Sequence, residues 1–237
     1  NKVVYVAPVV HLGSTDKKND SPIPAMTGGG DVCLKSGYIV NDTHYVIKIA
    51  GGGFVDSQTN TSYPNSGAML VFSQQTGALN AVLLDDGILT ELRTAAASAL
   101  ACKYFAPSQI TNIGIVGTGI QARYQLEMLQ YVIPFKSLPN VNVYVYGRSQ
   151  AKCEKYKQDM MGKGIACKTT NDMHDIGRHC NLIIMCTSAR SPVLMEKHLM
   201  DSRGKPIYQS TGLHISCIGA DSKGKQELEE SIISKHA

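Results

Sequence analysis

The first part of the chain consists of short runs of β-branched and aliphatic residues that alternate with turn-forming stretches. The runs occupy residues 3–10, 44–50, 67–73 and 79–87, and clusters of glycine, asparagine and serine separate them. Such runs between turn residues predict short β-strands, and residues 51–67 are predicted to form a loop. Several strands close together along the chain favour an antiparallel or mixed sheet.

The pattern changes after Asp86. Residues 89–107 are rich in alanine and contain neither glycine nor an internal proline. This composition predicts a helix that starts at Thr90 or Glu91 and ends before Pro107.

From Gln109 onward, apolar runs alternate with stretches of helical spacing. This alternation predicts a parallel sheet whose crossover helices lie on its faces. The predicted strands are 110–117, 141–147, 166–170 and 181–188, and the predicted helical segments are 120–133, 150–164 and 171–180. The sequence therefore predicts an α/β protein with a boundary near residue 108, which separates a mostly β domain (1–108) from an alternating α/β domain (109–237).

Composition narrows the classes of protein that fit. A chain of 237 residues with 43% hydrophobic and 18% charged residues can bury a sizeable core, which excludes a disordered chain. The net charge of +4 comes from interspersed charges, so we expect no nucleic-acid partner. No run reaches the roughly 18 apolar residues of a membrane helix, so no membrane partner is expected. The seven cysteines, an odd number without a CxxC pair, are typical of free thiols in a reducing compartment, which predicts a cytoplasmic protein.

A glycine-rich turn lies between the strand at 110–117 and the next helix. It reads G-T-G-I-Q-A over residues 117–122. Gly117 permits the tight turn, Gly119 lets the backbone approach a pyrophosphate, and Ala122 allows close packing of helix on strand. The helix N-terminus adds free N–H groups. We therefore predict a Rossmann-type dinucleotide site, with these cofactor-binding residues: Gly117, Thr118, Gly119, Ile120 and Gln121. The alternative, which the strand–turn–helix context disfavours, is a tight turn without a ligand.

The end of the second predicted strand of this domain bears on the choice between NAD and NADP. It reads Tyr146-Gly147-Arg148-Ser149, without the acidic residue that binds the ribose of NAD. Arg148 can pair with a 2′-phosphate and Ser149 can donate a hydrogen bond to it, which predicts that NADP is preferred over NAD. The alternative is that Arg148 is a solvated turn residue.

Several segments together resemble the ornithine cyclodeaminase/μ-crystallin family. The motifs are RTAAA at 93–97, GTGIQAR at 117–123 and GADSKGKQEL at 219–228, with supporting likeness at 44–50 and 186–194. The resemblance implies a homodimer in which residues 109–237 form the NAD(P)-binding Rossmann domain. Residues 1–108 would carry substrate binding and dimerisation, and the last residues of the chain could return to that first domain.

The resemblance also implies roles for individual residues. Lys48 matches a lysine that contacts the substrate carboxylate and assists catalysis, Arg93 an arginine that grips the same carboxylate, and Asp221 an acid/base at the substrate nitrogen. Thr187 and Ser188 match residues at the nicotinamide end of the pocket. The chemistry is consistent, because arginine pairs with a carboxylate in a fork and a carboxylate can relay a proton.

One feature departs from the family pattern. Many members carry a further arginine near the N-terminus, whereas no arginine precedes Arg93 here. His11 or Lys17 could substitute for it. The substrate could therefore differ from those of other members.

The other candidate chemistry is weaker. His174 and His179 are five residues apart, which is the wrong spacing for a shared helix face, and we expect no metal site. His214 could border the pocket near Asp221 or belong to the core. The pair at 85–86 is expected to form a turn and helix start.

These expectations lead to one function and two alternatives. The leading hypothesis is an NAD(P)-dependent oxidoreductase that reduces a ketimine or imino acid, or oxidises an L-amino acid, at the C–N bond next to a carboxylate. The first alternative is an ornithine cyclodeaminase with recycled NAD, and the second is a μ-crystallin-like NADP-dependent protein that binds a small ligand. Both enzyme hypotheses imply a small amino or imino acid as substrate.

Overall fold

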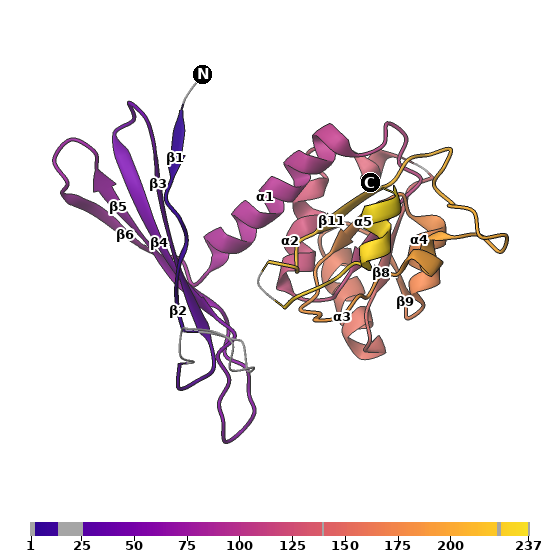
Figure 1. Ribbon diagram of the computed structural model, residues 1–237, viewed down its shortest axis with the longest axis horizontal. Coiled ribbons are helices and arrows are strands. Elements are labelled where there is room, and N and C mark those ends of the chain that lie inside the picture. The colour runs from indigo at the N-terminus through magenta and orange to yellow at the C-terminus, as the bar shows by residue number, and fades with distance from the viewer. Residues whose placement is uncertain (1–2, 14–25, 139, 222–223, 237) are drawn as a thin grey trace. The chain divides into compact units, whose positions relative to one another are not determined.

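The computed structural model describes residues 3–13, 26–138, 140–221 and 224–236 (Figure 1). It divides into two compact units, Asn1–Thr90 and Glu91–Ala237. None of the described helices combines the length and the apolar composition that crossing a bilayer requires.

The first unit is built on a six-stranded antiparallel sheet. Its strands are β1 (Val4–Val6), β2 (Val10–Leu12), β3 (Asp31–Ile39), β4 (His44–Gly52), β5 (Ser66–Ser73) and β6 (Leu79–Leu84). The order is β1-β3-β4-β5-β6, and β2 also pairs with β3. The predicted strands are present and their antiparallel pairing is one of the two arrangements expected.

Strand β3 is the main element of this unit that the sequence pattern missed. Its sequence, DVCLKSGYI, contains no continuous apolar run, so it did not stand out from the turn-rich stretch before it. It is stabilised instead by pairing, since β1 and β2 bind one edge of it and β4 binds the other. Strand β4 also extends to Gly52, so the predicted loop begins two residues later than expected.

Pairing places a row of polar side chains on one face of the first sheet. His11 of β2 is opposite Cys33, and Lys35 of β3 is opposite Lys48 of β4. Because side chains alternate between faces along a strand, Asp31, Cys33 and Lys35 point to the same side. This face therefore carries His11, Asp31, Cys33, Lys35 and Lys48.

The second unit contains the predicted parallel sheet. Its elements are α1 (Ile88–Phe105), β7 (Asn112–Val116), α2 (Ile120–Leu129), β8 (Asn142–Tyr146), α3 (Gln150–Met161), β9 (Cys167–Thr170), α4 (Met173–His179), β10 (Leu182–Met185), β11 (His214–Cys217) and α5 (Glu230–His236), with 3-10 turns η1 (Phe135–Ser137) and η2 (Glu196–Leu199). The strand order is β11-β10-β7-β8-β9, and every pair is parallel. Along the chain, β8 and β9 are added on one side of β7, whereas β10 and β11 are added on its other side. The strand order therefore reverses between β7 and β10, and open α/β sheets bind ligands at such a switch point.

Alternate residues of the central strands enter two cores, one on each face of this sheet. Ile113, Ile115 and Ile184 pack with buried residues of α1, α2 and α3. Val116 and Ile183 pack on the other face with α4, η2 and α5. The strands are apolar throughout because both of their faces are covered. The α/β fold class is thus confirmed, while β11, η1, η2 and α5 were not predicted.

All of helix α1 except its first three residues belongs to the second unit. It begins at Ile88, two residues before Thr90, the earlier of the two predicted starts, because the Asp85 carboxylate accepts a hydrogen bond from the backbone N–H of Leu89 (2.9 Å). This cap agrees with the predicted turn and helix-start role of residues 85–86. Cys102 lies in the same core as Ile113, so the division falls at the start of the helix, whereas the predicted boundary near 108 lies just past its end.

Candidate functional site

The turn between β7 and α2 requires glycine at one position and leaves open space at another. Gly117 has a φ of +115°, and a Cβ there would lie 2.5 Å from the carbonyl oxygen of Cys186. Gly119 has ordinary extended backbone, and a Cβ there would meet no heavy atom within 4 Å. The positive φ and the close approach to Cys186 therefore require glycine at position 117, whereas Gly119 leaves space beside the first turn of α2.

The first turn of α2 offers uncapped N–H groups at this space. Gly119 is the N-cap and supplies no side-chain hydrogen bond, and no acidic residue occupies the first turn. The first N–H groups of a helix have no partner within the helix, so they can bind an anion. The predicted positions Thr118 and Ile120 flank Gly119 in this turn.

The carbonyl groups of the turn are held by Arg123. Its Nη1 donates to the carbonyl oxygens of Thr118 (2.6 Å) and Gly119 (3.0 Å). The same guanidinium donates through Nε to Asp159 (3.0 Å) and lies 5.0 Å from the centre of the Tyr156 ring. Hydrogen bonding from Arg123 to Asp159 holds the pKa of the Asp159 carboxyl below its usual value. Arg123 was assigned no role from the sequence, although it is part of the GTGIQAR motif.

The side chain of Gln121 is engaged within the protein. Its amide donates to the carboxylate of Glu91, a buried residue of α1, and its oxygen accepts from Gln125 Nε2 (2.8 Å). The side chain thus fastens α2 to α1. For the predicted cofactor role, this leaves the backbone N–H of Gln121 in the first turn of the helix.

A pocket of about 480 Å³ lies beside the ends of β8 and β10. It is lined by Arg148 and Ser188, which the sequence analysis had singled out, and also by Tyr146 and Arg190. Two arginines among the lining residues favour a ligand with more than one negative charge. Arg190 was missed, although it follows the buried strand β10 at the carboxyl edge of the sheet, where ligands bind.

Ser149 has a structural role at the start of α3. It is the N-cap of this helix, and its hydroxyl accepts a long hydrogen bond from the backbone N–H of Lys152 (3.5 Å). It is not one of the lining residues of the pocket that contains Arg148.

The loops that follow β10 and β11 are joined by Glu227. This residue is 1% exposed. Its carboxylate accepts hydrogen bonds from the Thr187 backbone N–H (2.6 Å), the Thr187 hydroxyl (2.7 Å) and the Gly219 N–H (2.8 Å). Thr187 is thereby fixed at the carboxyl edge of the sheet. Glu227 was not predicted, although it lies within the GADSKGKQEL motif.

The cysteines near Glu227 are poor nucleophiles. Burial, and then the negative charge of Glu227, raise the pKa of Cys217 to about 12 and that of Cys186 further still. Both thiols therefore stay protonated near neutral pH. All seven cysteines are free, as expected.

Asp221 and His214 lie at opposite ends of β11. Asp221 follows the strand, is 66% exposed in its side chain, and forms an ion pair with Lys225 Nζ (2.6 Å). His214 begins the strand, where its Nε2 lies 2.9 Å from the Ser216 hydroxyl oxygen and burial lowers its pKa. Of the two alternatives for His214, a core histidine fits better than one that borders a pocket near Asp221, because β11 lies between the two residues.

The other predicted substrate residues are distributed over both units. Lys48 lies in the middle of β4, on the polar face of the first sheet. Arg93 is exposed on α1, in the second unit with Asp221. Their roles stay predictions.

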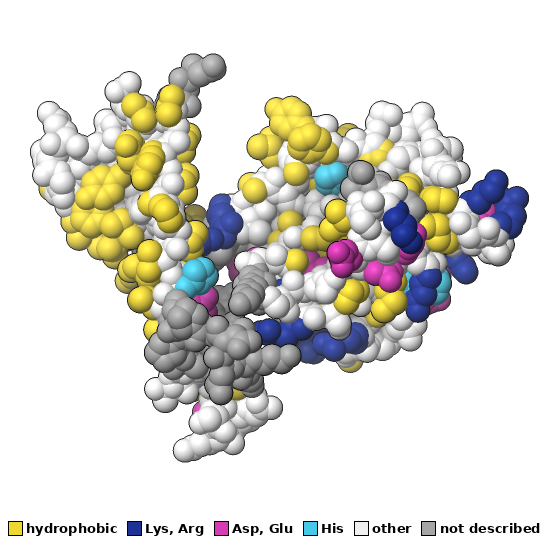
Figure 2. Space-filling view, viewed as in Figure 1, with side chains coloured by type: hydrophobic (Ala, Val, Ile, Leu, Met, Phe, Trp, Pro, Cys, Tyr) yellow, Lys and Arg dark blue, Asp and Glu magenta, His cyan; other side chains and the backbone are white. Residues whose placement is uncertain are grey.

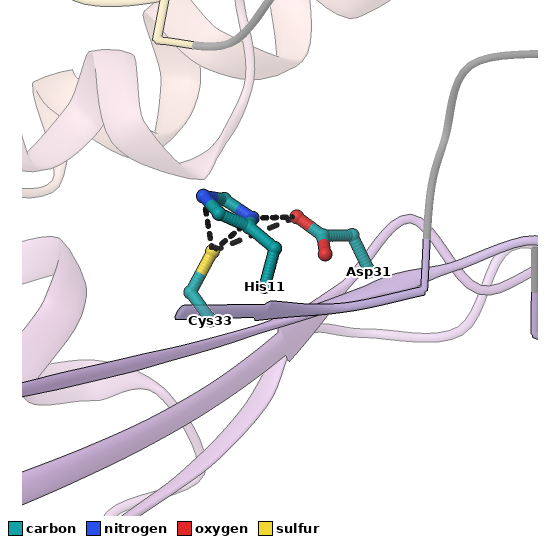
Figure 3. Close-up of side chains that lie close together, drawn as sticks. All are labelled: His11, Asp31 and Cys33. Carbon is teal, nitrogen blue, oxygen red and sulfur yellow. Dashed lines mark hydrogen bonds and ion pairs between the residues drawn. The ribbon is translucent and has the colours of Figure 1, made fainter. Parts of the chain in front are cut away.

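A cluster that sequence reasoning missed lies on the first sheet (Figure 3). His11 Nδ1 is 2.9 Å from Asp31 Oδ2, and Cys33 Sγ is 3.3 Å from the same nitrogen. Strand pairing brings these residues together, so their spacing along the chain gave no signal. By contrast, His174 meets His198 edge to face, and His179 stacks on Tyr144.

The parallel sheet with its switch point, the glycine turn and the uncapped helix start together define a Rossmann-type α/β protein. A family model described as the ornithine cyclodeaminase/mu-crystallin family matches residues 29–237. The chain belongs to this family, which confirms the resemblance noted in the sequence.

Known relatives are longer than this chain. An uncharacterized cyclodeaminase of Sinorhizobium fredii is 30% identical over 207 residues, which are 87% of this chain and 58% of that protein. The iminosuccinate reductase of Paracoccus denitrificans is 27% identical over 78% of this chain and 53% of its own length. A solved archaeal alanine dehydrogenase dimer with bound NAD has a TM-score of 0.76 and 25% identity, covering 98% of this chain and 62% of that one. The chain thus spans between half and two thirds of these relatives.

Other curated relatives include an alanine dehydrogenase, ketimine reductases named mu-crystallin, and an ornithine cyclodeaminase. Members of the family are therefore NAD(P)-dependent oxidoreductases or cyclodeaminases.

Replacing Glu227 by glutamine tests its role in joining the two loops. Glutamine keeps one acceptor oxygen but turns an NH₂ group toward a donor, so we expect Glu227→Gln to lower the free energy of unfolding by about 1.5–3 kcal/mol. Urea denaturation followed by circular dichroism measures this. The matched control Glu230→Gln changes an exposed carboxylate and should cost less than about 1 kcal/mol. Equal stability of the two variants would contradict the role.

Proposed function

We propose that this protein uses NADPH or NADH to reduce a C=N bond next to a carboxylate, or runs the reverse oxidation of an L-amino acid. The observation that carries the proposal is the arrangement at the carboxyl edge of the parallel sheet. There the open space at Gly119 and the pocket with Arg148 and Arg190 fit the phosphates of a dinucleotide. Membership of a family of oxidoreductases and cyclodeaminases supports it.

Several residues would hold successive parts of a phosphorylated dinucleotide. The N–H groups of the α2 start would hold the pyrophosphate, because Gly119 leaves room for it. Arg148 and Arg190 would hold a 2′-phosphate, so we propose that NADP is preferred over NAD. Since Ser188 lines the same pocket as Arg148, we assign it to the adenosine end and keep Thr187 for the nicotinamide end.

The chain's own residues would bind the substrate and move its proton. Arg93 and Lys48 fix the carboxylate, Arg93 through a forked ion pair and Lys48 as a second positive charge. Asp221, which is exposed on its loop, gives a proton to the substrate nitrogen in reduction and takes one in oxidation. When bound, the cofactor supplies the hydride for the carbon next to the carboxylate. These roles are carried over from the family.

We also propose that the protein is a homodimer. The sheet of the first unit exposes many apolar side chains, and hydrophobic residues gather over its strands in Figure 2. They include Tyr5, Val10, Val82 and Leu84, which the strand register places on the face opposite Lys48. Such a patch normally binds another protein surface. Sedimentation equilibrium of the full chain should give twice the chain mass, and a monomer at micromolar concentration would contradict the proposal.

Turnover assays test the proposed reaction. The protein is incubated with NADPH or NADH and a panel of cyclic ketimines, or with pyruvate and ammonia, while the absorbance of the reduced nicotinamide is followed. We expect loss of absorbance that depends on the substrate. A second assay supplies ornithine with catalytic NAD and measures proline and ammonia. Proline without net cofactor change would identify a cyclodeaminase instead, and NADPH binding without turnover in either assay would identify a binding protein.

Gly119→Ala separates cofactor binding from folding. The new methyl group meets no protein atom but fills the space proposed for the pyrophosphate, so the Kd for NADPH should rise at least tenfold with an unchanged Tm. Fluorescence titration and thermal denaturation measure the two quantities. The control Gly162→Ala, where the nearest atom is 3.4 Å away at the end of α3, should keep both near their original values. NADPH affinity that is insensitive to Gly119→Ala would reject the pyrophosphate site.

Arg148→Asp tests the cofactor preference. A carboxylate repels a 2′-phosphate and accepts hydrogen bonds from the 2′-hydroxyl of NADH, so the ratio of NADPH to NADH affinity should fall at least tenfold. Arg203→Asp, at an exposed turn, is the control and should leave the ratio unchanged. If the ratio stays the same in Arg148→Asp, this residue does not select the cofactor.

A further inference from the structure

We propose that His11, Asp31 and Cys33 form a binding site for a divalent transition-metal ion of the zinc class. The three residues lie on β2 and β3, and each offers a different metal ligand: an imidazole nitrogen, a carboxylate oxygen and a sulfur. Their ligand atoms all lie within 4.8 Å of one another (Figure 3). All three belong to the first unit, so the proposal does not depend on the dinucleotide site.

Strand pairing explains why the three side chains meet. His11 is directly opposite Cys33 in the antiparallel β2–β3 pair. Asp31 precedes Cys33 by two residues and therefore projects from the same face of the sheet. The paired backbones of β2 and β3 thus fix the Cα positions of all three residues. Metal binding therefore has to order only their side chains.

The distances between the ligand atoms are close to those of a tetrahedral site. His11 Nδ1 is 2.9 Å from Asp31 Oδ2, and Cys33 Sγ is 3.3 Å from the nitrogen and 3.5 Å from the oxygen. Typical zinc–ligand bond lengths at a tetrahedral angle require about 3.3 Å between nitrogen and oxygen and about 3.5 Å between sulfur and either. An ion could therefore enter after movements of a few tenths of an ångström.

The geometry favours a metal site over a nucleophilic cysteine. In a Cys–His–Asp relay, the thiol contacts one ring nitrogen and the carboxylate contacts the other. Here both contact Nδ1, while Cys33 Sγ is 4.0 Å from Nε2. The ligand atoms converge on one point, as metal ligands do, instead of forming a chain.

The charges and the exposure also suit a cation. Asp31 and a deprotonated Cys33 together neutralise a divalent ion. The second oxygen of Asp31 is buried without a hydrogen-bond partner among the described residues, and a cation bound to this carboxylate would compensate for the missing hydrogen bond. The His11 side chain is 43% exposed, which leaves the site open to solvent. Three protein ligands leave a fourth position for water or a small anionic ligand.

Cobalt(II) is a suitable probe because its spectrum reports both sulfur ligation and geometry. The full chain, stripped with a chelator, is titrated with Co²⁺ and then with Zn²⁺. We expect one Co²⁺ per chain, a thiolate-to-cobalt charge-transfer band with tetrahedral visible bands, and displacement by Zn²⁺. Cys33→Ser should abolish the charge-transfer band, and His11→Gln should weaken Co²⁺ binding at least tenfold.

Controls connect the result to this cluster. Cys217→Ser removes a thiol of the second unit, and His44→Gln removes an exposed histidine of the same sheet, so both should bind Co²⁺ like the original protein. Circular dichroism verifies that each variant folds. If a cluster variant does not fold, Asp31→Asn is measured in its place. Failure of the original protein to bind Co²⁺ through sulfur would overturn the proposal, as would a charge-transfer band that persists in Cys33→Ser.

Discussion

The close approach of the chain at Gly117 is the constraint on which the candidate cofactor site depends. Gly117 turns with a positive φ within reach of the Cys186 carbonyl, and its N–H donates to the Tyr146 carbonyl (2.9 Å). The Cys186 N–H in turn donates to the Val116 carbonyl (2.7 Å). The ends of β7, β8 and β10 are thus joined at one point, and the loops that follow them share one edge of the sheet.

Two charged side chains stabilise the loops around this point. Arg123 binds the carbonyl groups of the glycine turn, which leaves the N–H groups at the start of α2 available for an anion. Glu227 binds Thr187 and Gly219, which fixes the loops after β10 and β11. Neither residue needs to contact a cofactor. Both residues position the groups that would contact a cofactor. A site held by loops can be preorganised in this way.

The sequence was most informative where local patterns carry the structure. Alternating apolar runs and helical stretches predicted the parallel sheet, and the GxGxxA turn at 117–122 predicted its ligand-binding edge. Strand β3 was missed because its polar residues interrupt any apolar run, and it is stabilised by pairing on both edges. The assignment of α1 to the second unit also depends on tertiary packing, since Cys102 packs with Ile113.

The candidate sites likewise contain residues that motifs predict and residues that only the fold brings together. The residues in the glycine turn and Arg148 follow from motifs, whereas Glu227 and Arg190 acquire their roles only when loops that are far apart in sequence meet. The His11–Asp31–Cys33 cluster is the extreme case, because 20 residues separate His11 from Asp31 and only the β2–β3 register brings them together.

We propose that the carboxyl edge of the parallel sheet binds a dinucleotide. Hydrogen–deuterium exchange of the full chain, with and without saturating NADPH, measures this directly, because a bound phosphate protects the amides that it contacts. We expect slower exchange at residues 117–123 and 187–190. Unchanged exchange there, or protection confined to the opposite edge at residues 177–181, would contradict it.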